Sequence, residues 1–279
     1  MPYADQPTVT ASGVEIPLLG FGTWQLEPAD ARRMVAEAIR IGYRHIDTAF
    51  IYKNEEAVGQ GIADAGVARD DLFVTTKIWV DNFHDGDLQK QARESAGRLG
   101  LTPDLLLLHW PKPNPPLAET IKALNEARAQ GFTRNIGLSN FPSAQFRQAA
   151  ALSDAPLITN QVEYHPYLSQ KTLIATAAEL GSSITAWSPL AQGKIAEEPV
   201  ILEIAKAHGK TAGQVALRWL IQQNVVAIPR TTKESRAREN FDIFDFALSD
   251  EEMARIHALG GPGGRIGDWI DSAFEWDQD

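Results

Sequence analysis

The stretch "GYRHIDTAFIYKNEE", residues 42–56, joins a strand-like run to the start of a helix. The apolar run ends in Asp47, although aspartate is a poor strand residue and a buried carboxylate is costly unless something pairs with it. Tyr52 follows five residues later, and the pair "EE" stands where negative charge favours a helix start. Asp47 is either a turn residue or a charge that the chain places at the end of a strand.

Seven more strand-like runs recur along the chain, which makes eight in all. They cover residues 18–24, 43–49, 72–79, 105–110, 134–140, 157–164, 183–190 and 225–231. Amphipathic segments such as 28–42 and 54–66 lie between them, and these begin with Pro or Asn and end in Gly, as helices tend to. Eight strand–helix units in a chain of this size predict a closed parallel (β/α)8 TIM barrel. The preceding "TVTASGVEIP" predicts an N-terminal β-hairpin with Ser12-Gly13 at its turn.

A doubly wound sheet is the competing fold class. It usually carries G-x-G-x-x-G after its first strand, which "LLGFGTWQLE" does not match, and the spacing of "GGPGGRIG" near the C-terminus is also wrong. The chain has no linker and no shift in composition. The sequence therefore predicts one barrel domain over residues 1–279.

Composition excludes several classes of protein. The chain has no cysteine, so a disulfide framework and a thiolate metal site are ruled out. The net charge of −10 argues against broad binding to nucleic acid or acidic membranes, although it permits a local anion pocket. The N-terminus does not resemble a signal peptide, and no apolar run reaches the ~18 residues that span a bilayer. We therefore expect a soluble cytoplasmic protein.

The ends of the eight runs predict a functional site, because chemistry in parallel barrels collects at the carboxyl ends of the strands. Polar, ionisable or aromatic residues close these runs: Gly22, Thr23, Trp24, Asp47, Lys77, Trp79, His109, Trp110, Ser139, Asn140, Gln161, Glu163, Trp187, Ser188, Arg230 and Thr231. Lys77 closes an apolar strand and needs a counter-charge if it is buried. Asp47 on the neighbouring strand is the obvious candidate.

Other interpretations of these residues remain open. His45 and Asp47 have the same parity, so both side chains point to one side of their strand. A metal site built from His45, Asp47 and His109 is conceivable, although no dense cluster of ligand-type residues accompanies it. His109 could also be a core histidine. Ser139 lacks the setting of a nucleophile elbow, which argues against acyl transfer.

Taken together, the motifs resemble those of the aldo-keto reductase family over nearly the whole chain. The matching segments are "GYRHIDTAFIYKNEEAVG", "TTKIW", "LLLLHWP", "GLSNF", "NQVEYHPYL", "WSPLAQGK" and "IPRTTKESRARENFDIFDFALSDEE". Within that family the chain is similar to bacterial 2,5-diketo-D-gluconate reductases of the B type, which are also associated with methylglyoxal; its tail "FEWDQD" is part of that likeness. The resemblance implies a TIM barrel that reduces small aldehydes or ketones with NADPH. Members are often monomers, which implies a monomer here.

The resemblance places the catalytic tetrad of the family on Asp47, Tyr52, Lys77 and His109. These residue types suit the protonation of an alkoxide left by hydride transfer. Tyr52 would donate the proton, and we expect the ammonium of Lys77 to lower the pKa of that phenol. Asp47 would hold Lys77 charged, and a neutral His109 would orient the carbonyl oxygen. No metal is implied.

The resemblance also assigns the cofactor contacts. At the nicotinamide, Ser139, Asn140 and Gln161 would bind the carboxamide and Trp187 would stack on the ring, with Gly22, Thr23 and Asp47 nearby. The pyrophosphate would be covered by Ser188, Leu190 and Gln192. The 2′-phosphate would be bound by Arg230, Thr231 and Arg236, and the adenine would lie at Glu239 and Asn240. The segment "RTTKESRAR" supports an anion site independently, because it concentrates positive charge in an acidic protein. For Lys233 and Arg238 we prefer a solvated helix face.

Aromatic residues at the strand ends predict the substrate pocket. Trp24, Phe50, Trp79 and Trp110 would line it together with His109, although tryptophan at a strand end more often serves packing. A second hypothesis is a regulatory protein on the same scaffold that binds cofactor with little turnover. The intact tetrad argues against it.

Overall fold

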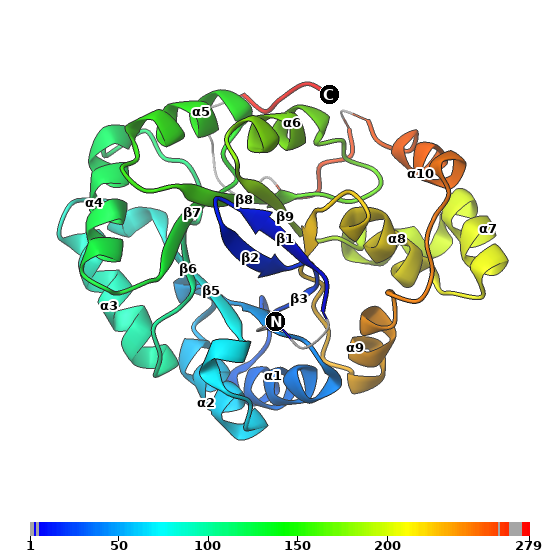
Figure 1. The fold of residues 1–279 in the computed structure, drawn as a ribbon, viewed down its shortest axis with the longest axis horizontal. Coiled ribbons are helices and arrows are strands. Elements are labelled where there is room, and N and C mark those ends of the chain that lie inside the picture. The colour runs from blue at the N-terminus through cyan, green and yellow to red at the C-terminus, as the bar shows by residue number, and fades with distance from the viewer. Residues whose placement is uncertain (1–2, 4–5, 262, 268–274) are drawn as a thin grey trace.

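The computed structural model describes residues 3, 6–261, 263–267 and 275–279, so Phe274 of the tail lies outside the described residues. Eight parallel strands form a ring with helices outside it (Figure 1). The strands are β3 (Gly20–Gly22), β4 (His45–Asp47), β5 (Phe73–Ile78), β6 (Leu105–Leu108), β7 (Asn135–Ser139), β8 (Leu157–Glu163), β9 (Ser183–Trp187) and β10 (Val226–Ala227). Each strand pairs with its neighbour in sequence. A parallel bridge between Leu19 and Ala227 joins the two ends, which confirms the predicted barrel.

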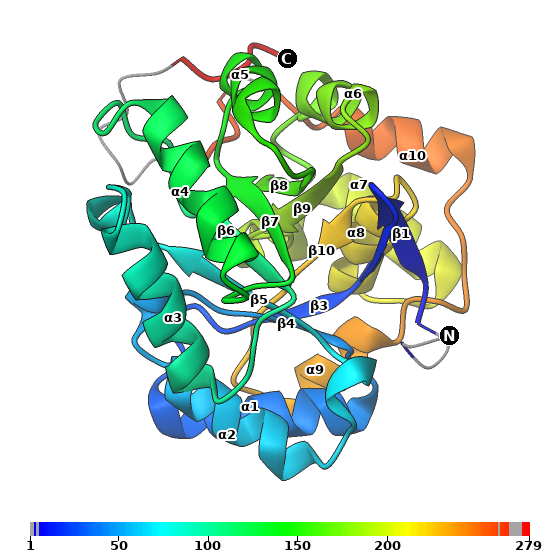
Figure 2. The ribbon, with the colours of Figure 1, turned by 60° about the vertical axis from the view of Figure 1, so that its left-hand side comes forward.

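Helices surround the strands in both views of the ribbon (Figures 1 and 2). They are α1 (Pro28–Ile41), α2 (Glu55–Ala65), α3 (Asp87–Leu99), α4 (Leu117–Ala129), α5 (Ser143–Leu152), α6 (Lys171–Glu179), α7 (Pro199–His208), α8 (Ala212–Ile221), α9 (Glu234–Phe241) and α10 (Asp250–His257). Short 3-10 turns are η1 (Phe50–Tyr52), η2 (Arg69–Asp71), η3 (Val80–Asn82) and η4 (Ala191–Glu197). Helix α1 illustrates how local sequence determines where a helix begins and ends. Pro28 fits the first helical position, and Gly42 ends the helix with φ 134°.

Strand β6 shows why the barrel strands are apolar along their length. All four leucines of "LLLL" are at most 1% exposed. One face of such a strand fills the barrel interior and the other lies under the helices, so neither face tolerates a charged side chain. Polar residues are therefore expected where strands end, and the site described below lies at those ends.

The N-terminal hairpin lies across the opening at the amino ends of the barrel strands (Figure 1). It consists of β1 (Thr8–Ala11) and β2 (Val14–Pro17), as the sequence predicts. Ser12 and Gly13 form the turn with φ of 47° and 82°, which is the left-handed conformation that a tight hairpin requires. The backbone N–H of Ser12 donates to the carbonyl of Gly181, just before β9, and ties the hairpin to the barrel.

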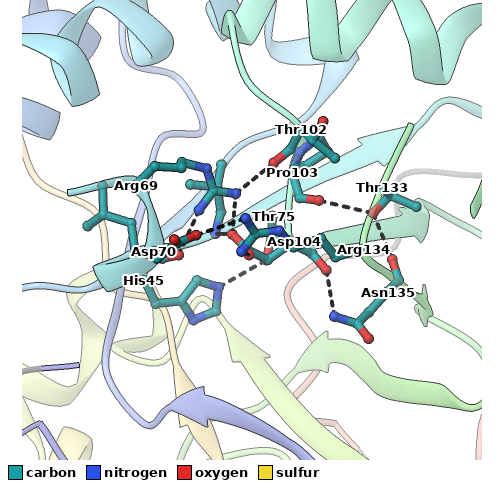
Figure 3. Close-up of polar contacts among 12 residues, drawn as sticks. His45, Arg69, Asp70, Thr75, Thr102, Pro103, Asp104, Thr133, Arg134 and Asn135 are labelled. Atoms are coloured by element: carbon teal, nitrogen blue, oxygen red, sulfur yellow. Dashed lines mark hydrogen bonds and ion pairs between the residues drawn. The ribbon is translucent and has the colours of Figure 1, made fainter. Parts of the chain in front are cut away.

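A charged network braces the amino ends of β5, β6 and β7 (Figure 3). The nearly buried carboxylate of Asp104 accepts hydrogen bonds from the backbone N–H of Val74 at 2.8 Å, from Arg69 at 2.6 Å and from Arg134 at 3.0 Å. Burial raises the pKa of Asp104, although both guanidinium groups and the Val74 amide oppose that shift. The network lies at the opposite end of the barrel from the strand ends that carry the predicted site.

Within the described part of the chain, no helix is both long and apolar enough to cross a membrane.

Candidate active site

A cavity of about 540 Å³ opens at the carboxyl ends of the barrel strands. It brings together most of the residues that the sequence predicts for the site: Gly22, Thr23, Trp24, Asp47, Tyr52, Trp79, His109, Trp110, Ser139, Asn140, Gln161, Trp187, Ser188, Leu190, Gln192, Arg230 and Arg236. These residues come from all eight barrel strands or the segments that follow them, with Tyr52 supplied by η1 and Arg236 by α9. The barrel is what gathers them, since they span more than two hundred positions of sequence.

A buried ion pair lies next to the cavity. Lys77 of β5 places Nζ 2.6 Å from Oδ1 of Asp47 on the neighbouring strand β4, and the two side chains are 0% and 3% exposed. The ammonium also donates to the backbone carbonyl of Thr48 at 2.8 Å. Oδ2 of Asp47 accepts a hydrogen bond from Gln161 Nε2 at 2.7 Å, so both carboxylate oxygens have donors. The counter-charge predicted for Lys77 is therefore present.

Tyr52 faces the cavity from η1. Nζ of Lys77 lies 5.1 Å from the centre of the Tyr52 ring. Burial raises the pKa of Tyr52 well above its usual value, and the negative charge of Asp47 raises it further. The net shift is opposite to the lowering that was expected from Lys77, because burial and the charge of Asp47 dominate it.

His109 lies between two aromatic rings at the inner end of the cavity. Its ring centre is 5.7 Å from that of Tyr52 and 5.3 Å from that of Trp79, both edge to face. Burial lowers the pKa of His109 well below its usual value, and the charge of Lys77 lowers it further, so the ring is neutral near pH 7.

The tautomer of His109 follows from its burial. Its Nδ1 is buried without a hydrogen-bond partner among the described residues. A proton on Nδ1 would bury an unpaired donor, which is rarer in proteins than an unpaired acceptor. We therefore assign the proton to Nε2, the nitrogen that is left to donate to a ligand.

A second network links the side chains predicted to hold a carboxamide. Asn140 Nδ2 donates to Ser139 Oγ and to the backbone carbonyl of His109, each at 3.0 Å. Trp187 Nε1 donates to Asn140 Oδ1 at 2.9 Å, and Ser139 Oγ donates to the backbone carbonyl of Gln161 at 2.8 Å. This network and the Gln161–Asp47 hydrogen bond connect the wall of the cavity to the buried ion pair.

Positive charge collects at the outer end of the cavity. Arg230 follows β10 and donates to Gln25 Oε1 at 2.7 Å, while Arg236 on α9 has no carboxylate partner among the described residues. Arg238, by contrast, forms ion pairs with Glu37 and Glu234 on the protein surface. An arginine left unpaired in an acidic protein favours an anionic ligand at this end.

Five predicted residues do not line the cavity, and one of them is Lys77, which is buried next to Asp47. The guanidinium of Arg98 lies 4.9 Å from the centre of the Phe50 ring. Turn η1 therefore directs Phe50 toward α3, which carries Arg98, and not into the cavity. Thr231 Oγ1 accepts a hydrogen bond from the backbone N–H of Lys233, in the turn before α9. Glu239 and Asn240 lie on α9 outside the cavity lining.

The structure adds wall residues that sequence reasoning missed, notably Gln25 and Ile51. Both directly adjoin predicted site residues, so proximity in sequence was the only available signal. The alternative metal site does not form: His45 Nε2 pairs with Thr75 Oγ1 at 3.0 Å, and the described residues contain no group of three or more ligand-type side chains that could hold a metal ion.

The cavity fits a phosphorylated dinucleotide such as NADPH. Amide and hydroxyl groups lie at its inner end and two guanidinium groups at its outer end. Positive φ angles at Ser188 (49°) and Gln192 (54°) turn the intervening loop along the wall. Gly22 lines another part of the wall without a side chain, and the space next to it is tight, since an added Cβ would lie only 3.0 Å from the carbonyl oxygen of Ile228.

Comparison with known proteins relates this chain to the aldo-keto reductases. The model of the "Aldo/keto reductase family" matches residues 18–260. The crystal structure of a candidate 2,5-diketo-D-gluconic acid reductase B is 49% identical, with a TM-score of 0.95 and 97% of each chain covered. Glyoxal reductase of Bacillus subtilis is 42% identical over 93% of this chain and 95% of its own length. An aldo-keto reductase of Bombyx mori, solved in complex with NADP, is 35% identical, with a TM-score of 0.85 over 91% of this chain and 93% of that one.

Proposed function

The chain belongs to the aldo/keto reductase family, and from that membership we propose that it reduces small aldehydes and ketones to alcohols with NADPH as the hydride donor. One observation carries the proposal: the Lys77–Asp47 pair, 2.6 Å apart and buried, lies beside a phenol and a neutral imidazole that both face one cavity. That arrangement offers a proton donor and a hydrogen-bond donor to a single carbonyl oxygen.

Tyr52 is the proposed proton donor. Its raised pKa keeps the phenol protonated throughout the neutral pH range, so the hydroxyl group carries the proton that it is to donate. A raised pKa does not prevent the transfer, because an alkoxide is the conjugate base of an alcohol and remains a far stronger base than a phenolate. The proton passes from the Tyr52 hydroxyl to the alkoxide oxygen, and Lys77 stabilises the phenolate that forms.

His109 is the proposed orienting group. Its neutral ring donates from Nε2 to the carbonyl oxygen, which fixes the carbonyl for attack and stabilises the negative charge that develops there. Asp47 acts through Lys77 and Gln161, since its two oxygens hold the donors of both side chains.

The cofactor, when bound, supplies the hydride. Ser139, Asn140 and Gln161 would hold its carboxamide, and the indole of Trp187 would cover the nicotinamide ring while Asn140 fixes its orientation. Arg230 and Arg236 would bind the 2′-phosphate, which is the group that distinguishes NADPH from NADH.

Small dicarbonyl compounds are the proposed substrates. A glyoxal reductase and a candidate 2,5-diketo-D-gluconic acid reductase are among the similar proteins, and both names point to substrates with neighbouring or multiple carbonyl groups. Trp24, Trp79 and Trp110 make the substrate end of the cavity mainly apolar.

Oxidation of NADPH by the purified protein in the presence of methylglyoxal, glyoxal or 2,5-diketo-D-gluconate tests this function. We expect turnover with at least one of the three and a lower rate with NADH. Tight NADPH binding without turnover of any of these or of a simple aldehyde would instead support a cofactor-binding protein that is not a reductase.

A further inference from the structure

Turn η1, which carries Tyr52, contacts helix α3 through one aromatic ring. Phe50 begins the turn, is half-buried and does not line the cavity. The guanidinium of Arg98 on α3 lies 4.9 Å from the centre of the Phe50 ring, within the roughly 6 Å of a cation–π contact. Helices α2 and α3 lie next to each other outside the barrel (Figures 1 and 2). The first residue of the turn is therefore held from outside the cavity.

A buried carboxylate fixes the orientation of Arg98. Glu55, the first residue of α2, is 1% exposed. Its Oε2 accepts a hydrogen bond from Arg98 Nε at 2.8 Å, and Arg98 Nη2 lies 2.8 Å from the same oxygen. Arg98 Nη2 also donates to Ser95 Oγ at 3.0 Å. A planar guanidinium that is held through two of its nitrogens cannot turn freely, so the cation stays above the Phe50 ring.

The other carboxylate oxygen of Glu55 contacts the strand that carries Lys77. Oε1 of Glu55 accepts a hydrogen bond from Thr76 Oγ1 on β5 at 2.5 Å. Thr76 directly precedes Lys77, and successive residues of a strand point to opposite faces. Thr76 therefore faces the helices, whereas Lys77 faces the barrel interior. Through Glu55 and its guanidinium partner, the outer face of β5 is connected to turn η1.

A role in starting helix α2 does not explain why Glu55 is buried. The next residue, Glu56, is exposed and places the same negative charge in the first turn of α2. A buried carboxylate is costly unless it is paired and hydrogen-bonded, and Glu55 meets that condition through Arg98 and Thr76. The burial of Glu55 thus goes with the fixing of these two partners.

We propose that Arg98, held by Glu55, clamps the Phe50 ring and thereby keeps turn η1 in the position from which Tyr52 reaches the reacting carbonyl oxygen. Glu55, Arg98 and Phe50 are positioning residues, because they act through Tyr52 and do not line the cavity. Misplacement of a reacting group by about 1 Å can cost roughly a hundredfold in rate, so a loosened turn should lower kcat. The catalytic half of this inference rests on the proposed function, whereas the clamping of the turn does not.

Hydrogen exchange tests the clamp without substrate. The backbone N–H groups of Tyr52 and Lys53 donate to the carbonyls of Ala49 and Phe50, each at 3.1 Å, so their exchange reports the opening of η1. The variant Phe50→Leu removes the aromatic face but keeps apolar bulk. In this variant we expect exchange at both amides to accelerate roughly fivefold, because the cation–π contact is lost. Phe50→Tyr keeps the ring and should exchange at the wild-type rate.

Kinetics test whether the clamp acts on catalysis. In Phe50→Leu and in Arg98→Lys we expect kcat for an aldehyde to fall roughly fivefold, since lysine keeps the charge of Arg98 but not its planar face. KM and the Kd for NADPH should stay at wild-type values, because neither residue lines the cavity. Phe50→Tyr should retain the wild-type kcat. Glu94→Gln is the matched control, because it removes an exposed carboxylate 4.0 Å from the same guanidinium.

The double variant Phe50→Leu/Arg98→Lys tests whether the two residues act through each other. If they are two halves of one contact, the second substitution removes nothing further, and kcat should stay roughly fivefold below that of the wild type. Independent effects would instead multiply to a loss of roughly twenty-five-fold.

Unchanged exchange in Phe50→Leu would show that the ring does not hold the turn. An unchanged kcat in the single variants, a KM or Kd that changes as much as kcat, or multiplied losses in the double variant would show that no clamp positions Tyr52. Each of these results overturns the proposal. A wild-type protein without turnover would contradict the proposed function, and exchange would still decide whether the turn is clamped.

Discussion

Lys77 Nζ and Asp47 Oδ1 lie 2.6 Å apart at the carboxyl ends of two neighbouring strands, and both side chains are almost completely buried. A buried charge that loses its partner is strongly destabilising, because the remaining ion is left unpaired at low dielectric. The pair is therefore a structural requirement of the barrel as well as part of the proposed proton-transfer machinery.

Replacement of Lys77 by methionine tests that requirement. We expect Lys77→Met to lower the free energy of unfolding by about 3–5 kcal/mol, because Asp47 is left buried and charged. The double variant Asp47→Asn/Lys77→Met should recover part of that loss, since it removes both charges. Lys112→Met is the matched control: its ion pair with Asp81 is exposed, so the expected loss is below about 1 kcal/mol. Urea denaturation provides the measurement, and a single variant as stable as the double one would refute the argument.

Arg236 should discriminate between the two nicotinamide cofactors. We expect Arg236→Ala to raise the Kd for NADPH roughly tenfold or more, because a charge-assisted hydrogen bond to the 2′-phosphate is worth about 1.5–3 kcal/mol. The Kd for NADH should hardly change. Lys233→Ala is the control, since Lys233 is exposed and does not line the cavity. Fluorescence titration of both cofactors decides the matter, and equal losses for NADPH and NADH would remove Arg236 from this role.

Asp104 tests whether stability and binding are separate at the two ends of the barrel (Figure 3). We expect Asp104→Ala to cost about 3 kcal/mol of unfolding free energy, because Arg69 and Arg134 lose a nearly buried partner. NADPH affinity should be unchanged. Asp70→Ala is the control, because Asp70 is 87% exposed and contacts only Arg134 in this network. A weaker NADPH affinity in Asp104→Ala would show that the two ends are coupled.

His45 should make stability depend on pH. Burial lowers the pKa of His45 to about 4, against an ordinary value near 6.5. Between these values the unfolded chain binds a proton at His45 that the folded protein does not. The contribution of neutral His45 to the free energy of unfolding is therefore fully present above pH 6.5 and falls as the pH drops toward 4. From pH 7 to pH 5 this one group should cost about 2 kcal/mol.

The variant His45→Gln should remove that part of the pH dependence. Comparison of unfolding free energies at pH 7 and pH 5 gives the result, with His84→Gln as a control that removes an exposed histidine. A His45→Gln protein that loses as much stability at pH 5 as the wild type would contradict the assignment.

Much of this architecture could be predicted from local sequence. The Ser12-Gly13 turn, the apolar runs, and the proline and glycine at the ends of α1 are local signals, and the structure has them where they were expected. The Asp47–Lys77 contact was also predictable, because both residues end adjacent parallel strands.

Other features depend on tertiary contacts that no local pattern contains. Gln161 reaches Asp47 across the barrel, and this hydrogen bond links strands that lie far apart in sequence. The direction of Phe50 depends on how η1 turns, and the pKa of Tyr52 depends on burial and on the nearby charge of Asp47. The hydrogen bonds that Asp277 and Asp279 accept from the backbone N–H groups of Ser143 and Thr172, at the starts of α5 and α6, also span more than one hundred positions of sequence.

The most direct test of the proposed mechanism is the turnover of Tyr52→Phe, which removes one hydroxyl group and leaves the ring in place. With NADPH and an aldehyde that the wild type reduces, we expect kcat to fall by roughly two to four orders of magnitude, the usual contribution of a positioned proton donor. The Kd for NADPH should match that of the wild type. A variant that turns over at the wild-type rate would show that the proton comes from another group, and the account of Tyr52, Lys77 and Asp47 would be wrong.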